Sequence, residues 1–342
     1  VYSDKYFWKD LLDENFLDTM RILADRALSY DDQLAEAYVL RGDYYRFNGQ
    51  KEQAIKEYDE ALRFNPNEWR AYWHKGDLYN YDDYVKTLEN YQRAASLNRG
   101  LFLPQIYRAI GGAYAESGFK ELSIFYYKEA LKLDDDSATH YNRLGGLEES
   151  NGNFNKAIEY YKKCLAIDST RWGISFRLGI VYGFLGQFEE SLAYMKLYER
   201  TFMTPVMTPE IPPHPHFIFR LGHAYHVNGF KEKADSIMNV GFELYNRLLE
   251  LQRHYDQDLF IFRVLSAMYA FMGNKEKAYE NLRLMNESQR FPLFMIKDLK
   301  NDPLLINLRD EPEFQQIVRD IEAKCQAEHE RVRQWLEEND ML

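Results

Sequence analysis

Histidines are the residues of this sequence whose type and spacing could hold a metal ion. Four of the eight histidines lie between residues 214 and 226, and imidazole is a common zinc ligand. His216 and His223 are seven residues apart, which is about 10 Å along a helix, so one ion cannot bridge them. His223 and His226 could form a pair with His214 reaching in from a loop, but neighbouring positions supply no carboxylate. We therefore predict no metal site, and two interpretations stay open: ordinary polarity, or contact with a ligand or partner.

No enzyme motif accompanies these histidines. The sequence lacks a phosphate-binding glycine loop, a nucleophile elbow, a His-Glu-x-x-His motif and a paired Cys-x-x-Cys motif. Its Asp and Glu residues follow spacings typical of solvated helix faces, so no pair stands out as an acid–base couple. We predict that the protein is not an enzyme and has no cofactor.

Composition restricts the partners further. The formal net charge is −11 and no Lys/Arg-rich run reverses it locally, so we do not expect direct nucleic-acid binding. Cys164 and Cys325 are too few and too distant for a disulfide framework or a metal knuckle, which fits a reducing compartment. No apolar stretch approaches the ~20 residues of a membrane helix and no signal peptide is visible. We expect a soluble, cytoplasmic segment without membrane insertion, and its start at Val1 suggests a piece of a longer protein.

Evenly spaced glycines indicate which elements must position these side chains. Gly42 and Gly76 are 34 residues apart, and the spacing stays at 34 or 35 through Gly111, Gly145 and Gly179. This period is typical of repeats made of two helices, here called helix A and helix B. Small residues allow close helix contact, so we expect Gly42 and Ala54 to face each other across a helix pair. A second set of glycines falls between helix A and helix B, where we expect positive φ: Gly49, Gly118, Gly152, Gly186, Gly229 and Gly273.

The first clear unit carries the frame Tyr38, Gly42, Tyr45, Gly49, Ala54, Tyr58, Ala61 and Pro66. This frame resembles the tetratricopeptide-repeat family. The resemblance implies an all-α fold, a right-handed superhelical α-solenoid of stacked helix-turn-helix repeats closed by a C-terminal capping helix. We assign residues 1–34 to a degenerate N-terminal repeat or cap, 35–290 to seven repeats and 291–342 to capping helices. The run from Leu305 to Phe314 is also similar to closing segments of tetratricopeptide sensor regions in bacterial multidomain regulators.

Three departures from the frame predict local changes. Asp83 replaces the turn glycine of the second repeat. The spacing between Gly179 and Gly222 is nine residues longer, which we place in a proline-rich insertion near 204–215. Residues 242–255 keep helical spacing and predict a longer helix B. The charged stretch 313–338 has apolar residues on one side, which suits either a cap over the last repeat or a dimer helix.

In the tetratricopeptide family the second, fifth, ninth and twelfth residues of helix A line a concave groove, and these positions share one helix face. Asp43 and Asp77 stand where chaperone-binding relatives have the clamp asparagine, so we do not expect chaperone tails as ligands. Mapping the family positions onto this sequence yields the following predicted binding residues: Arg46, Arg70, Trp73, Asp77, Arg108, Asn142, Phe176, His216, Phe219, His223, His226, Phe260 and Arg263.

The resemblance implies a non-enzymatic interaction or sensory module that binds a partner segment or ligand in its groove, as part of a larger bacterial signalling or transcription-regulatory protein. One alternative is a free-standing scaffold that assembles other proteins. Another is a small-molecule receptor that uses the C-terminal half of the groove. A protein or peptide segment is the expected partner, a small molecule stays open, and residues 313–338 could form a homodimer.

Overall fold

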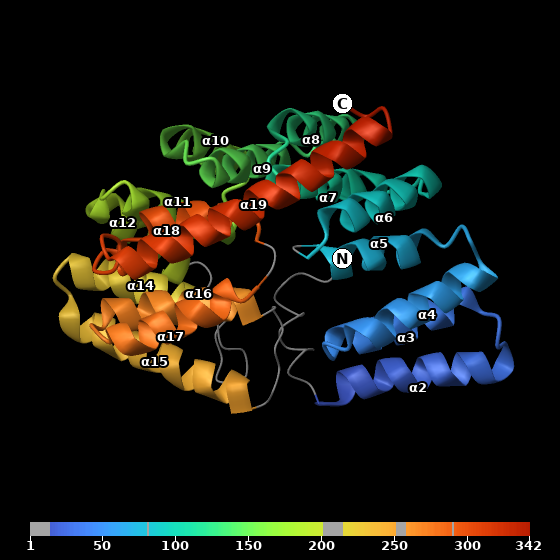
Figure 1. Cartoon of the computed structure of the whole chain (residues 1–342), viewed down its shortest axis with the longest axis horizontal. Coiled ribbons are helices and arrows are strands. Elements are labelled where there is room, and N and C mark those ends of the chain that lie inside the picture. The colour runs from blue at the N-terminus through green and yellow to red at the C-terminus, as the bar shows by residue number, and fades with distance from the viewer. Residues whose placement is uncertain (1–13, 81, 201–214, 251–257, 289–290) are drawn as a thin grey trace. The chain divides into compact units, whose positions relative to one another are not determined.

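The computed structural model describes residues 14–80, 82–200, 215–250, 258–288 and 291–342, and these ranges form helices without strands (Figure 1). Over the described ranges, the predicted all-α solenoid of helix pairs is confirmed. The chain divides into two compact units. Unit 1 contains Val1–Asp134 and Glu330–Leu342, and unit 2 contains Asp135–His329. Among the described helices, none is long and apolar enough to cross a membrane.

Unit 1 begins with α2 (Glu14–Tyr30), which precedes three helix pairs: α3 (Ala35–Phe47) with α4 (Lys51–Phe64), α5 (Trp69–Tyr79) with α6 (Tyr84–Leu97), and α7 (Leu103–Glu116) with α8 (Lys120–Asp134). Unit 2 has four pairs: α9 (Ser137–Ser150) with α10 (Phe154–Ile167), α11 (Trp172–Phe184) with α12 (Phe188–Tyr198), α14 (Pro215–Val227) with α15 (Lys231–Glu250), and α16 (Asp258–Phe271) with α17 (Lys275–Asn286). The C-terminal elements are α18 (Phe294–Asn301), η2 (Pro303–Leu305) and α19 (Pro312–Glu338).

The two helices of a pair approach each other where a helix A glycine meets a large helix B side chain. A Cβ atom added to Gly42 would lie 2.4 Å from Cε1 of Tyr58, well inside van der Waals contact. The side chain nearest to Gly42 is thus Tyr58, one turn further along α4 than Ala54, and the expected facing of Gly42 and Ala54 stays a prediction. Tyr58 is fully buried there. The same relation recurs at Gly76/Tyr91, Gly111/Tyr127, Gly145/Tyr161, Gly179/Met195 and Gly222/Met238.

Glycines also make the turns between helix A and helix B. Gly152 follows α9 with φ +75°, in the left-handed region that side chains disfavour. Its neighbour Asn153 donates its backbone N–H to Glu148 O and so closes the turn. All six predicted turn glycines have positive φ, between +69° and +88°. In the second pair, Asp83 takes the turn position and its side chain caps α6 by accepting from the Lys86 N–H.

Three expectations about less regular parts of the chain can be compared with the helices. The long helix B is confirmed as far as Glu250, because α15 has 20 residues. Residues 251–255 of that expectation and the insertion 204–214 lie outside the described residues. In the N-terminal segment the described part is the single helix α2, in which Ala24 is fully buried.

Apolar side chains of α19 are covered by the chain itself in both units. In unit 2, Phe314, Ile317 and Ile321 are buried in one cluster with Leu282 and Met285 of α17. In unit 1, Val332 and Leu336 are fully buried in a cluster with residues of α6 and α7, and Trp335 packs against it. This burial supports the cap, and it removes the exposed apolar side on which the homodimer prediction depended.

Candidate functional site

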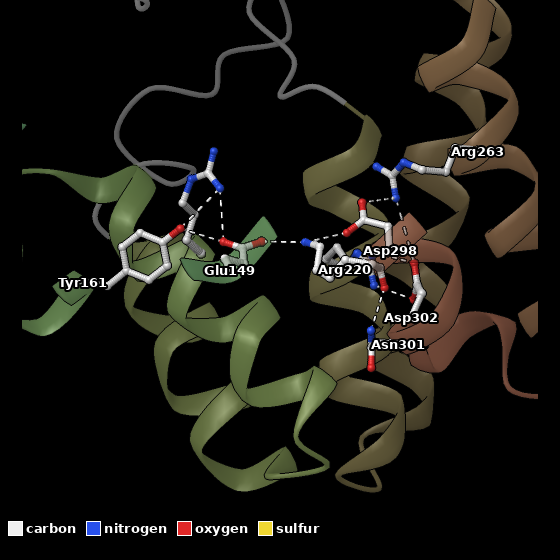
Figure 2. Close-up of polar contacts among 9 residues, drawn as sticks. Glu149, Tyr161, Arg220, Arg263, Asp298, Asn301 and Asp302 are labelled. Carbon is white, nitrogen blue, oxygen red and sulfur yellow. Dashed lines mark hydrogen bonds and ion pairs between the residues drawn. The ribbon is translucent and has the colours of Figure 1, made fainter. Parts of the chain in front are cut away.

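The candidate site of unit 2 lies where the C-terminal segment meets the first helices of three pairs. We call the surface formed by α9, α14 and α16 the helix A face. Figure 2 shows α18 and the residue after it turned toward this face, with side chains of both signs pointing at one another. The charge network consists of six buried residues, Glu149, Arg220, Arg263, Lys297, Asp298 and Asp302.

Lys297 and Asp298 make the first contacts of this network. Lys297 Nζ lies 2.9 Å from Glu149 Oε1 on α9 and 2.6 Å from Asp298 Oδ1. Asp298 Oδ2 in turn lies 3.2 Å from Arg263 Nη1 on α16. The adjacent pair of opposite charges on α18 therefore connects two first helices that are more than 100 residues apart in sequence.

Asp302 and Arg220 form the other contact. Arg220 Nη1 of α14 donates to Asp302 Oδ1 at 2.6 Å, and its Nη2 donates to the second carboxylate oxygen (Figure 2). Arg263 Nη1 lies 4.0 Å from the same carboxylate. Asp302 also accepts the backbone N–H of Leu304 at 3.0 Å, which holds the turn between α18 and η2. Such a bidentate Arg–carboxylate pair forms only with a carboxylate in the right orientation, so it depends on geometry as well as on charge.

Glu149 is the hub of the network on the α9 side. Besides Lys297, its carboxylate accepts the Tyr161 hydroxyl at 2.6 Å (Figure 2). It also pairs with Arg177 at 3.2 Å. Burial by itself would raise the pKa of Glu149, but the charges of Lys297 and Arg177 outweigh burial and lower it. Glu149 is therefore ionised at neutral pH.

The network is electrically balanced. Three carboxylates face Lys297, Arg220 and Arg263, with half-exposed Arg177 at its edge. Burial would lower the pKa of Lys297, yet Asp298 and Glu149 raise it above its ordinary value. Burial would raise the pKa of Asp298, yet Lys297 and Arg263 lower it. Glu149, Lys297 and Asp298 stay charged because each has an opposite charge in contact.

His223 occupies an apolar part of the same face. Its ring lies 5.4 Å from that of Phe271 and 6.3 Å from that of Phe188. His226, one turn further along α14, lies 4.9 Å from Phe271. Burial lowers the pKa of His223 to about 4, so the imidazole is neutral at pH 7. Within the described ranges no three His, Cys, Asp or Glu residues gather as a metal site would require; His214 lies outside those ranges.

In unit 1, predicted site residues gather around His74. Its Nε2 lies 3.6 Å from Asp43 and its Nδ1 lies 3.6 Å from Asp77. Each aspartate also accepts a helix B tyrosine hydroxyl at 2.7 Å, Asp43 from Tyr58 and Asp77 from Tyr91. Arg46 Nε lies 3.4 Å from Asp43. The two tyrosines are buried, but Asp43, Asp77, His74 and Arg46 are partly exposed. This surface therefore combines both signs of charge within reach of solvent.

The remaining predicted residues have individual surroundings. Arg70 is half exposed and pairs with Glu68 at 3.3 Å, and Trp73 packs on Tyr91 with ring centroids 5.2 Å apart. Arg108 is buried and paired with Asp134 at 2.6 Å. In unit 2, Phe176 packs on Tyr198, Phe219 packs on Phe242, and Asn142 is partly buried on α9. The side chains of His216 and Phe260 lie outside the described part.

Comparison with known families decides the identity of the repeat. The family model described as tetratricopeptide repeat matches residues 35–68, which span α3 and α4, and again residues 139–171, which span α9 and α10. This is a tetratricopeptide-repeat protein. The repeats make the protein an interaction module or scaffold, because repeats of this family generally bind peptide or protein partners and are generally not catalytic.

Solved structures resemble this tetratricopeptide-repeat protein to different degrees. A chain in the structure of the APC/C hetero-tetramer Cut9-Hcn1 has a similar fold, with TM-score 0.51 and 13% identity over 68% of this chain and 44% of the other. The type IV pilus biogenesis factor PilW has TM-score 0.45 and 18% identity, over 63% and 92%. The peptide-binding tetratricopeptide protein YrrB has TM-score 0.37 and 15% identity, over 53% and 93%. No curated protein sequence matches the chain.

Of the six residues in the charge network of this tetratricopeptide-repeat protein, the sequence predicted only Arg263 as a binding residue. His223 and Arg263 were among the predicted residues, but Lys297, Asp298 and Asp302 follow the last repeat and were assigned to the cap. One signal was available: Lys297 and Asp298 interrupt the apolar run from Phe291 to Leu299. A charged pair inside a buried segment needs partners of opposite charge.

Proposed function

We propose that this protein is a non-enzymatic interaction module that holds partner protein segments on the faces formed by its first helices. The observation that carries the proposal is the charge network of unit 2. There α9, α14 and α16 each direct a buried charged side chain to one short segment, α18 and Asp302. First helices of this protein can therefore hold a segment by specific polar contacts, and a partner segment needs the same kind of surface.

For an external partner we propose the first helices of unit 1, α3 and α5. Arg46 and Arg70 carry positive charge there, and Asp43 and Asp77 carry negative charge. Partly exposed charges of both signs suit a peptide that carries both signs, and the half-exposed guanidinium of Arg70 can still form contacts with a partner's carboxylate. The charged side chains favour a polar peptide over an apolar one.

A peptide library selected against the full chain tests this proposal. Selected peptides are measured by fluorescence anisotropy against the wild type, Arg70→Ala and the control Arg63→Ala, a well-exposed arginine on helix B that pairs with Glu60. We expect Arg70→Ala to weaken binding by about 10-fold, the effect of one good interface arginine, while Arg63→Ala leaves it unchanged. Peptides that bind both variants as well as they bind the wild type would contradict the assignment of this face.

The wider role is also a proposal. A module of a larger bacterial signalling or regulatory protein and a free-standing scaffold both need the same binding faces. The sequence on the N-terminal side of Val1 separates them, since a DNA-binding, cyclase or membrane segment supports the first and an immediate initiator methionine the second. The small-molecule alternative has less support, because Phe176, Phe219 and His223 are buried by the chain's own side chains.

A further inference from the structure

The segment that contains α18 has two chemically different sides. Met295 and Leu299 are fully buried in an apolar cluster with Phe291, Leu305 and Phe314. Lys297 and Asp298, between them in sequence, instead contact Glu149 and Arg263 of the helix A face. One side of the segment therefore packs like any terminal cap, and the other side is recognised by charge.

A cap does not need the charged side. Taking charges out of water costs free energy that an ion pair often only offsets, and apolar residues of similar size stabilise at least as well. The neighbouring helix α19 covers unit 2 in that way, with Phe314, Ile317 and Ile321. Buried ion pairs do select one sequence and one register over others, since a mismatched segment leaves a buried charge without a partner. The charge network thus has the properties of a recognition site.

The order of charges along the segment defines what the site recognises. Lys297 meets Glu149, Asp298 at the next position meets Arg263, and Asp302 four residues later meets Arg220. A segment with acidic residues at all three positions would bring like charge to Glu149. A segment with basic residues at all three would bring like charge to both arginines.

We propose that residues 294–302 are a built-in ligand of the helix A face of unit 2, and that a partner's helical segment with Lys, then Asp at +1 and +5, binds there by displacing them. This inference rests on the proposed function and names the partner chemistry of one of its faces. While residues 294–302 occupy the face, a segment with a different order of charges cannot displace them. A partner segment with the same order of charges displaces residues 294–302 when its local concentration is high.

The effect of displacement on peptide affinity can be calculated. A tethered segment competes at an effective concentration on the order of 1 mM. If the open face binds a free peptide with a dissociation constant of about 100 μM, the tethered segment weakens that binding by about 10-fold. A chain whose own segment lacks the three charges should therefore bind the free segment about 10-fold more tightly than the wild type does.

The probe is a fluorescent peptide of residues 291–303, measured by anisotropy against the full chain. The test variant carries Lys297→Met, Asp298→Asn and Asp302→Asn, which keep side-chain size and remove charge. The matched control is Lys300→Met, because Lys300 lies on the exposed side of α18 and pairs with Glu322. We expect about 10-fold tighter binding to the test variant, wild-type behaviour of the control, and no binding of a peptide with all three charges reversed. Equal binding of both peptides, or no gain in the variant, overturns the proposal.

Hydrogen exchange on the same variant distinguishes a ligand from a structural cap. We expect α18 to exchange faster while α9, α14 and α16 keep their protection. Loss of protection in all four helices together means that the segment is needed for folding, and the proposal is then wrong.

A second variant stays informative if the triple variant does not fold. In Glu149→Lys the peptide preference should reverse, so that a peptide with Glu at position 297 binds better than the wild-type peptide. A preference that does not follow the charge at 149 refutes the inference. Neither result affects the Arg70 test, which uses unit 1 and other peptides.

Discussion

We expect α14 to become less stable at acidic pH because of one buried histidine, His223. The perturbation is a change from pH 7 to pH 5, applied to the wild type and to His223→Gln. Burial lowers the pKa of His223 from 6.5 in the unfolded chain to about 4 in the folded protein. Between these values the unfolded state binds a proton that the folded state does not, so the free energy of unfolding falls as pH falls from 6.5 toward 4.

The magnitude follows from the two pKa values. At pH 5 the unfolded histidine is almost fully protonated and the folded one is about one-tenth protonated, so the loss is about 2 kcal/mol. The full shift corresponds to about 3 kcal/mol, reached below pH 4. Glu149 and Asp298 contribute little between pH 7 and pH 5. The pKa values of Glu149 and Asp298 are lowered from 4.5 and 3.8, so their stabilisation is lost only at more acidic pH.

Hydrogen exchange of α14 amides measures the opening free energy of this helix at each pH after correction for the intrinsic exchange rate. We expect the wild type to lose about 2 kcal/mol of protection between pH 7 and pH 5, and His223→Gln to lose much less. His226→Gln is the matched control, since His226 contacts the same Phe271 but is partly exposed. It should keep the wild-type pH dependence. If His223→Gln shows the same loss as the wild type, the burial argument is wrong.

Three further predictions concern the repeats and the cap, each measured as the free energy of unfolding in urea. Gly145→Ala should destabilise the protein by about 1–3 kcal/mol, because the added Cβ would lie 2.5 Å from the Tyr161 ring. The adjacent Gly146→Ala, whose Cβ would lie 3.8 Å from the Tyr161 hydroxyl, should instead stabilise it by up to about 1 kcal/mol through helix propensity. Equal effects of the two substitutions would contradict the close-contact explanation. Gly152→Ala should cost about 1–2 kcal/mol from its φ of +75° although nothing crowds the position, and a neutral result would show that the turn relaxes. Ile321→Ala should cost about 2–5 kcal/mol, since Ile321 of α19 is fully buried in the cluster with Leu282 and Met285. A loss below about 1 kcal/mol would contradict the capping role.

The repeat could be read from the sequence because its determinants are local and periodic. Two glycines recur about every 34 residues, one at a fixed position of helix A and one at the turn. The first is needed because a large helix B side chain lies against it, and the second because the turn has positive φ. Such requirements leave the same residue type at the same place in most units, although Asp83 takes the turn position of the second pair. The close contact of Gly42 with the Tyr58 ring was not predicted, because Ala54 and Tyr58 lie one turn apart on α4 and both are fully buried.

The same reasoning predicted only those residues of the candidate site that lie at groove positions of the repeats. His223 and Arg263 belong to repeats, so their register predicted that they share a face. Lys297 and Asp302 lie beyond the last repeat, where no register continues. Their contacts with Glu149 and Arg220 span 148 and 82 residues, and no periodicity relates such distant positions.

The sequence by itself thus determined the helix pairs, their turn glycines and the kind of protein, because each depends on interactions inside a unit of about 34 residues. Only the tertiary structure decided that the C-terminal segment lies on the helix A face, and that Glu149, Arg220 and Arg263 are engaged there by Lys297, Asp302 and Asp298. The physical reason is that a charge can be buried only where an opposite charge meets it, and where the chain brings the two together depends on the packing of all the intervening helices.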